Sequence, residues 1–154
     1  MRLNYSQSGD DELRKGMERT AKRLPGDLFQ AMKETTSLVR TRATTHHLAG
    51  ATLKPHTHSL QRSVKEKVKW LGPIIMGIVG IPAQSPADAY GAIHEFGGVI
   101  KAKPGKFLVF QIGGKWIRTK QVDMPKREWL LKSWQDVQSK VEIIFGRKIE
   151  ISIG

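Results

Sequence analysis

Residues 90–98 read Tyr-Gly-Ala-Ile-His-Glu-Phe-Gly-Gly, a stretch that predicts a short helix ending abruptly in paired glycines. Just ahead of it, Ser85 can cap the first free amides, Pro86 suits the first helical position, and Asp88 can complete a capping box. We expect Gly97 to end the helix, because paired glycines permit the positive φ angles of a sharp reversal. The stretch therefore predicts a helix-to-strand corner.

The side chains of this corner favour an architectural role. At helical spacing Ala89, Ile93 and Phe96 share one face, and we expect that face to dock on a sheet. His94 and Glu95 are sequence neighbours, whose side chains diverge by about 100° on a helix, so they do not suit one reacting atom. We expect His94 to hydrogen-bond the returning loop and Glu95 to meet a basic residue, in this chain or a neighbouring copy.

Length and composition indicate one basic domain. The chain has 154 residues, enough for a single core, and 39% of them are hydrophobic. The formal net charge of +12, from 26 Lys and Arg against 14 Asp and Glu, favours acidic partners such as nucleic acid. Cysteine is absent, the start lacks an apolar signal core, and the most apolar run, residues 71–83, is too short to span a bilayer. We expect a protein made in the cytoplasm with no membrane partner.

The N-terminal region predicts two helices and a loop. The first helix is expected from about Leu13 to the Pro25-Gly26 break, and the second from Asp27 until it frays at residues 44–47. Residues 50–59 are interpreted as a loop. We divide the chain into an N-terminal helical region with a flexible loop, residues 1–58, and an α+β core, residues 59–154, within a single domain overall.

The next segments predict strands. In residues 64–70 a largely apolar set, Val64, Glu66, Val68 and Trp70, alternates with lysines. Residues 74–81 are apolar on both faces, as in a central strand covered above and below. Short strands are also expected at residues 99–102, 107–112 and 115–122, the last two joined by a Gly113-Gly114 turn.

The C-terminal part predicts a long amphipathic helix. Its apolar stripe consists of Leu130, Trp134, Val137, Val141 and Ile144, and we expect it to end near Gly146. Residues 149–153 alternate and predict a small strand that pairs with another chain. The fold class is therefore α+β: an antiparallel sheet of about four to five strands with N-terminal helices, one short inserted helix and the long C-terminal helix.

Catalytic and metal-binding patterns are not recognisable in this sequence. His46, His47, His56 and His58 match no established metal spacing, and we interpret them as part of a polar loop. There is no nucleophile elbow, no phosphate-binding glycine loop and no pair of carboxylates on a common face. We expect no catalytic residues, no metal and no cofactor, and therefore a protein that is not an enzyme.

A basic hairpin offers a different function. Residues 99–127 contain eight Lys and Arg residues and a single acidic residue, Asp123. With Phe107 and Trp116 they resemble a platform on which bases stack and phosphates are neutralised. The alternative function is therefore a nucleic-acid-binding module. Its candidate contacts to nucleic acid or another acidic partner are Lys101, Lys103, Lys106, Lys115, Arg118 and Lys120.

Two motifs carry a family resemblance. Residues 90–100 read Tyr-Gly-Ala-Ile-His-Glu-Phe-Gly-Gly-Val-Ile, and residues 124–130, after the Gly-Gly hairpin, read Met-Pro-Lys-Arg-Glu-Trp-Leu. They resemble the tail-completion or virion-morphogenesis family of tailed bacteriophages, which shows a Tyr-Ala-x-x-His/Asn-Glu/Gln-Phe-Gly-Gly/Thr element and later Pro-Ala-Arg-Pro-Phe-Leu. The resemblance covers residues 60–145. It departs at Lys126 and Glu128, where small residues and proline are usual, so the last helix is expected to start differently.

The resemblance implies a structural virion protein that completes the tail or forms the neck at the head–tail junction. It implies a ring, with a hexamer as the expected form, assembled in the host cytoplasm and located in the virion. The implied partners are other copies of the chain, the tail tube or tail terminator, head-connector proteins, and genomic DNA passing through the lumen. The residues carried over, with roles in folding and subunit contact, are Tyr90, His94, Glu95, Phe96, Gly97, Gly98, Pro125, Arg127, Trp129 and Leu130.

Overall fold

The computed structural model describes residues 8–54 and 58–153, and its contacts divide the chain into two compact units. Within the described residues, unit 1 combines 8–38, 66–78 and 137–153, and unit 2 combines 39–65 and 79–136. Each unit therefore joins segments that are distant in the sequence, and neither coincides with residues 1–58 or 59–154.

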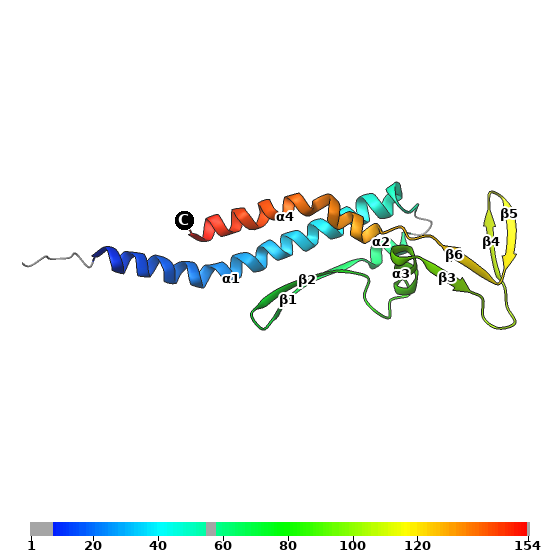
Figure 1. Ribbon diagram of the computed structural model, residues 1–154, viewed down its shortest axis with the longest axis horizontal. Coiled ribbons are helices and arrows are strands. Elements are labelled where there is room, and N and C mark those ends of the chain that lie inside the picture. The colour runs from blue at the N-terminus through cyan, green and yellow to red at the C-terminus, as the bar shows by residue number, and fades with distance from the viewer. Residues whose placement is uncertain (1–7, 55–57, 154) are drawn as a thin grey trace, which may run out of the picture. The chain divides into compact units, whose positions relative to one another are not determined.

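The expected mixture of helix and sheet with a long C-terminal helix is confirmed. The elements in chain order are α1 (Ser8–Arg42), the π-helix η1 (Ala43–Ala51), α2 (Ser59–Ser63), β1 (Lys65–Leu71), β2 (Ile74–Gly80), α3 (Asp88–Phe96), β3 (Gly98–Lys101), β4 (Leu108–Ile112), β5 (Lys115–Thr119), β6 (Gln121–Met124) and α4 (Trp129–Ile153) (Figure 1).

The expectation of one sheet with four to five strands is wrong. The strands form three two-stranded sheets, β1 with β2, β3 with β6 and β4 with β5. The apolar strand β2 is not covered above and below, because Ile74 and Ile78 remain largely exposed. A wider sheet needs a continuous apolar face to bury, and these short strands do not present one.

In unit 1, the C-terminal half of α4 lies beside the middle of α1, and the two helices run antiparallel (Figure 1). Thr20 Oγ1 donates to the carbonyl of Ser152 at 3.1 Å, and the Oγ of the same serine donates to Asp27, about two turns after Thr20, at 2.6 Å. On the β1–β2 side, the rings of Phe29 and Trp70 stack with their centroids 5.9 Å apart. Polar contacts therefore help to join the helices of unit 1.

Two predicted helix boundaries in unit 1 are wrong. Helix α1 runs from Ser8 through Pro25 without a break, so the two expected N-terminal helices are one. Proline inside a helix costs about 3 kcal/mol, but the packing of α1 against its neighbours holds the residues on both sides in register. Helix α4 likewise continues past Gly146 to Ile153, and the expected strand at residues 149–153 is helix. Among the helices of the described residues, none combines the length and apolar composition needed to cross a bilayer.

Unit 2 has the larger buried apolar core. Its buried members are Ala43, Leu48, Leu53, Val64 and Trp129, and Leu60, Val79, Ile81 and Leu130 pack against them. Residues 44–47, expected to fray, instead belong to η1, which buries Leu48. The loop expected at residues 50–59 is shorter in its described part, because Ala51 ends η1 and Ser59 begins α2; residues 55–57, including His56, lie outside the described residues.

The corner is formed much as the glycines predict. Gly97 ends α3 with φ +72° and ψ −179°, a backbone conformation that is essentially restricted to glycine. The amide of Ala87 donates to Ser85 Oγ at 3.3 Å, although the helix itself begins only at Asp88. Beyond the corner, Gly113 and Gly114 both have positive φ and join β4 to β5 as the expected two-residue turn.

Candidate functional site

Glu95 binds the start of the last helix. Its two carboxylate oxygens accept hydrogen bonds from the backbone amides of Leu130 at 2.8 Å and Leu131 at 3.0 Å. These amides belong to the first turn of α4, where no carbonyl within the helix can pair with them. A buried carboxylate at that position also interacts favourably with the helix dipole. The predicted partner, a basic residue, is therefore wrong: Glu95 pairs with backbone amides of its own chain.

His94 is buried without a side-chain partner. Only 4% of its surface is exposed, and neither ring nitrogen has a hydrogen-bond partner among the described residues. Its backbone carbonyl, rather than its ring, accepts the amide of Arg127 at 3.0 Å, so the expected side-chain bond to the returning loop is wrong. Burial, followed by the charge of Arg127, lowers the pKa of His94, and the ring is therefore neutral near pH 7.

The two sequence motifs are packed against each other within unit 2. The indole Nε1 of Trp129 donates to the carbonyl of Gly91 at 3.2 Å, and the buried indole lies in the core of that unit. A Cβ on Gly97 would stand 2.9 Å from the amide nitrogen of Lys126, so only glycine fits at this crossing. A Cβ on Gly98 would meet Ile93 at 3.0 Å. The motif residues thus build one corner between α3 and the start of α4.

Other motif residues remain on the surface. Phe96 is 73% exposed, and Ala89 and Tyr90 are also exposed. The prediction that the Ala89 and Phe96 face of the helix docks on a sheet is therefore wrong. The buried side of α3 instead carries Gly91, His94 and Glu95. Hydrophobic periodicity selects the wrong side of this helix because it does not represent contacts made by backbone and carboxylate groups. Pro125 is exposed between β6 and α4, and Leu130 is half-buried.

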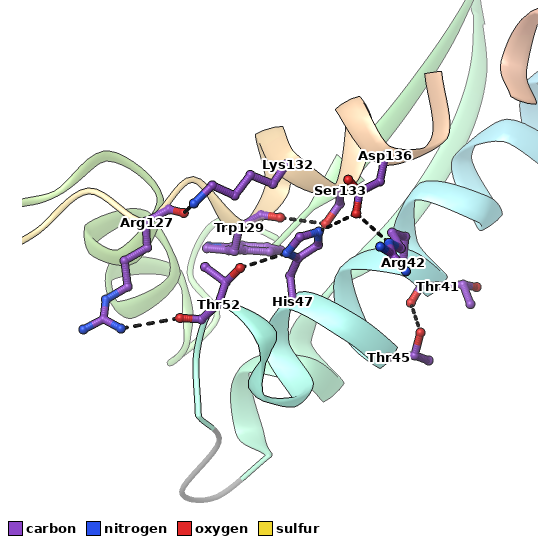
Figure 2. Close-up of polar contacts among 10 residues, drawn as sticks. All are labelled: Thr41, Arg42, Thr45, His47, Thr52, Arg127, Trp129, Lys132, Ser133 and Asp136. Carbon is purple, nitrogen blue, oxygen red and sulfur yellow. Dashed lines mark hydrogen bonds and ion pairs between the residues drawn. The ribbon is translucent and has the colours of Figure 1, made fainter. Parts of the chain in front are cut away.

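A cavity of about 790 Å³ opens beside the corner, entirely within unit 2. Arg127 and His94 line it, and the Tyr90 ring stands edge-on to the His94 ring with their centroids 4.4 Å apart. One guanidinium nitrogen of Arg127 contacts the carbonyl of Thr52 at 3.5 Å (Figure 2), whereas its buried Nε has no partner among the described residues. Lys54 and His58 also belong to the lining.

A second polar cluster joins η1 to α4 in the same unit (Figure 2). The ring of His47 contacts Thr52 Oγ1 at 2.8 Å through Nδ1 and Asp136 Oδ2 at 3.0 Å through Nε2. Arg42 donates to the same Asp136 oxygen at 2.7 Å. These hydrogen bonds, that of Arg42 first and that of His47 second, lower the pKa of Asp136.

The hydroxyl, imidazole and carboxylate of this cluster follow the order of a hydrolase triad, but their surroundings favour a structural role. A triad also needs free backbone amides that stabilise an oxyanion. The amides nearest the hydroxyl, those of Thr52 and Leu53, both donate to the carbonyl of His47, at 3.1 and 2.9 Å. Since these donors are engaged, the cluster closes the end of η1 against α4.

The potential metal-ligand atoms in this region are those of His46, His47 and Asp136, which lie within 4.8 Å of one another. A cation at this position would compete with the Arg42 guanidinium for the same carboxylate oxygen, and the repulsion between two positive charges disfavours it. His58 lies elsewhere, before α2, where its ring contacts Gln61, so the described histidines do not gather into one group.

The basic hairpin residues are all exposed. Lys101 is in β3, Lys115 and Arg118 are in β5, and the remaining three, Lys103, Lys106 and Lys120, lie in the connecting turns. Trp116, 73% exposed, and Arg118 share one face of the β4–β5 pair, since they are two residues apart on a strand. The Arg118 guanidinium stands 3.8 Å from the centre of the Phe107 ring.

Several residues of these sites could not be found from the sequence. His47 and Asp136 are separated by 89 positions, and no local motif links them. Thr52 and Lys54 lie in a segment that was interpreted as a loop. Carboxylates often cap helix starts, so capping was a possible role for Glu95. The sequence does not show which helix start it caps, because that start lies 35 positions further along the chain. Searches against protein-family models, curated proteins and solved structures found no match.

Proposed function

We propose that this chain is a structural protein of a tailed-phage virion, completing the tail or forming the neck at the head–tail junction as a ring. The observation that carries the proposal is the direct contact between the two motifs that resemble the tail-completion family. Glu95 of the first motif caps the helix that the second motif opens, and Trp129 of the second donates back to Gly91 of the first. The residues that carry the resemblance therefore act together as one structural element.

The surface of unit 1 supports self-association. Leu13 and Met17, one turn apart on α1, are each about two-thirds exposed, and on α4 Ile153 is 68% and Ile149 38% exposed. Exposed apolar side chains that recur on a helix face mark sites of contact with other proteins. A ring protein needs such contacts on every subunit, and the long helices of unit 1 offer them.

The test of the ring measures the mass of the purified full-length protein by light scattering, with and without tail tubes. We expect a ring-sized assembly that is lost in the double variant Leu13→Ser, Met17→Ser. The variant Lys15→Ser is a matched control, because Lys15 is exposed on the same turn but points to another side. A strict monomer under both conditions would contradict the proposal.

A phage deleted for this protein tests the location. Under the proposal, heads and tails accumulate separately, because the missing component joins them. Electron microscopy of such lysates distinguishes this outcome from intact virions, which would contradict a role at the junction.

A second candidate function is nucleic-acid binding by residues 99–127. The specific observation in its favour is the shared face of Trp116 and Arg118 together with exposed cations in the turns. An aromatic ring can stack on bases while the cations neutralise phosphates. A basic face inside a ring could contact the genome, so this function is compatible with the first.

Nucleic-acid binding predicts an affinity that falls steeply with salt concentration, with a slope set by the number of phosphate contacts. Reversing Lys101, Lys115 and Lys120 to Glu should weaken DNA binding and reduce that slope. Reversal of Lys140, an exposed cation of α4 outside the hairpin, should leave both unchanged. If the triple variant kept the wild-type affinity, this second function would be excluded.

A further inference from the structure

We infer that the cavity beside the α3 corner binds a carboxylate carried on a small apolar body, with Arg127 as its principal contact. This inference is independent of the ring and of its place in the virion. It concerns only the residues of unit 2 that line the cavity and the charges that they leave unpaired.

The first argument is the unpaired charge of Arg127. Among the described residues it forms no ion pair, its Nε is buried without an acceptor, and its only side-chain hydrogen bond is the 3.5 Å contact to the carbonyl of Thr52. A buried donor without a partner costs about 1–3 kcal/mol. An arriving oxyanion would remove that cost, and the long contact to Thr52 holds the side chain only weakly, so the guanidinium can turn toward a ligand.

The second argument is His94. His94 lines the same cavity and is only 4% exposed. Neither of its ring nitrogens has a hydrogen-bond partner among the described residues. A neutral imidazole still carries one N–H donor, which suits an anion that Arg127 has already attracted. Two unpaired polar side chains that line one cavity thus call for the same kind of ligand, an acceptor of hydrogen bonds.

The third argument is the character of the cavity wall. Among the described residues that line the cavity, none is acidic, and Lys54 adds a further positive charge. The remaining wall is largely apolar, with Leu48, Leu60 and Tyr90. Its volume of about 790 Å³ falls within the usual range for sites that hold small organic ligands.

These features favour a carboxylate over a phosphate. The edge of a guanidinium formed by Nε and one terminal nitrogen pairs side by side with the two oxygens of a carboxylate, and Nε is the unpaired atom here. A doubly charged phosphate usually needs several cations. Besides Arg127, the basic side chains of the lining are the neutral His94, the exposed Lys54 and the exposed His58, whose ring is already in contact with Gln61. The carboxylate can belong to a free small molecule or to a side chain of another copy of this chain.

The test uses the full-length protein, with benzoate as the probe and benzamide, which has the same shape without the charge, as its control. Benzoate should raise the melting temperature and saturate with a dissociation constant of about 1 mM or lower, and benzamide should do neither. Arg127→Gln should weaken benzoate binding at least about tenfold, because the paired hydrogen bonds are lost. Lys126→Gln is the matched control, since Lys126 is adjacent but does not line the cavity.

Two further measurements keep the test decisive. If Arg127→Gln fails to fold, Lys54→Gln, an exposed substitution in the lining, should weaken benzoate binding by about threefold through the lost charge. Failure of benzoate to saturate at about 20 mM, equal binding of benzoate and inorganic phosphate, or unchanged affinity in both variants would overturn the inference.

A dilution series separates the two sources of carboxylate. If another copy supplies the group, benzoate will compete with self-association and Arg127→Gln will lower it. If the natural ligand is a free carboxylate, self-association will not respond to benzoate. Both outcomes require that benzoate binds at Arg127, and they differ only in what it displaces.

Discussion

The two units of the molecule bury their side chains in different ways. Unit 2 encloses Leu48, Val64 and Trp129 in an apolar core, whereas the fully buried positions of α1 in unit 1 include Ala31, Thr35 and Thr36. Most of the larger apolar residues of the unit 1 helices are only half-buried, and Leu13, Met17, Ile143, Ile151 and Ile153 lie on the surface. Unit 2 therefore has an apolar core of its own, while unit 1 leaves more of its apolar area exposed.

The largest expected effect tests the core of unit 2. Trp129→Ala should lower the free energy of unfolding by about 4 kcal/mol, because it removes a buried indole and its hydrogen bond to Gly91. Trp134→Ala, on the same helix but 40% exposed, should cost less than about 1.5 kcal/mol. Urea denaturation of both variants measures the difference. Similar losses of unfolding free energy in the two variants would mean that the buried position of Trp129 adds no more stability than the exposed position of Trp134.

The corner provides the next test. Gly97→Ala should cost about 3 kcal/mol or more, because it combines a glycine-only conformation with a close approach to the backbone of Lys126. Gly105 has a similar φ of +74° but nothing within 4 Å of its missing Cβ. Gly105→Ala should therefore cost only about 1 kcal/mol. Equal costs would show that the backbone crossing at Gly97 adds nothing to the strain.

The cap of α4 is a smaller contribution within unit 2. Glu95→Gln should lower the free energy of unfolding by about 1–2 kcal/mol, because one oxygen becomes an N–H₂ group that faces an amide donor and the negative charge is lost. Glu128→Gln removes a carboxylate that pairs with the exposed Lys126, and its melting temperature should stay that of the wild type. If Glu95→Gln also melted like the wild type, the cap would not contribute to stability.

Local chemistry predicted the features that depend on one stretch of sequence. Gly97 at the end of α3 and the Gly113-Gly114 turn follow from the freedom of glycine at positive φ. The same local rules wrongly predict a helix break at Pro25 and a strand at residues 149–153. They fail there because they cannot represent the contacts between α1 and α4. The cavity was equally hidden, since Arg127 reaches His94 only after the chain has folded back across β3–β6.

A pH-dependent effect should follow from His94. Burial and Arg127 lower its pKa in the folded state, so below about pH 6.5 the unfolded chain binds more protons. Stability should fall as the pH drops through that value toward the folded pKa, and His94→Gln should remove this part of the loss. Asp136 contributes in a separate window, because its lowered pKa adds stability that is lost only as the pH falls below about 4. Unfolding at pH 8 and pH 5 measures the difference, and an unchanged pH dependence in His94→Gln would refute it.

The smallest effect on stability is expected in unit 1. Ile149→Ser combined with Ile153→Ser should lower the free energy of unfolding of the dissociated protein by less than about 1 kcal/mol, because Ile153 is 68% exposed and Ile149, at 38%, is only partly covered. Self-association should nevertheless weaken, and Glu150→Ser, on an exposed position between them, should leave it unchanged. A loss of stability as large as that of Glu95→Gln would mean that these isoleucines are already packed within unit 1. The apolar face would then serve folding, and the contrast between the units would disappear.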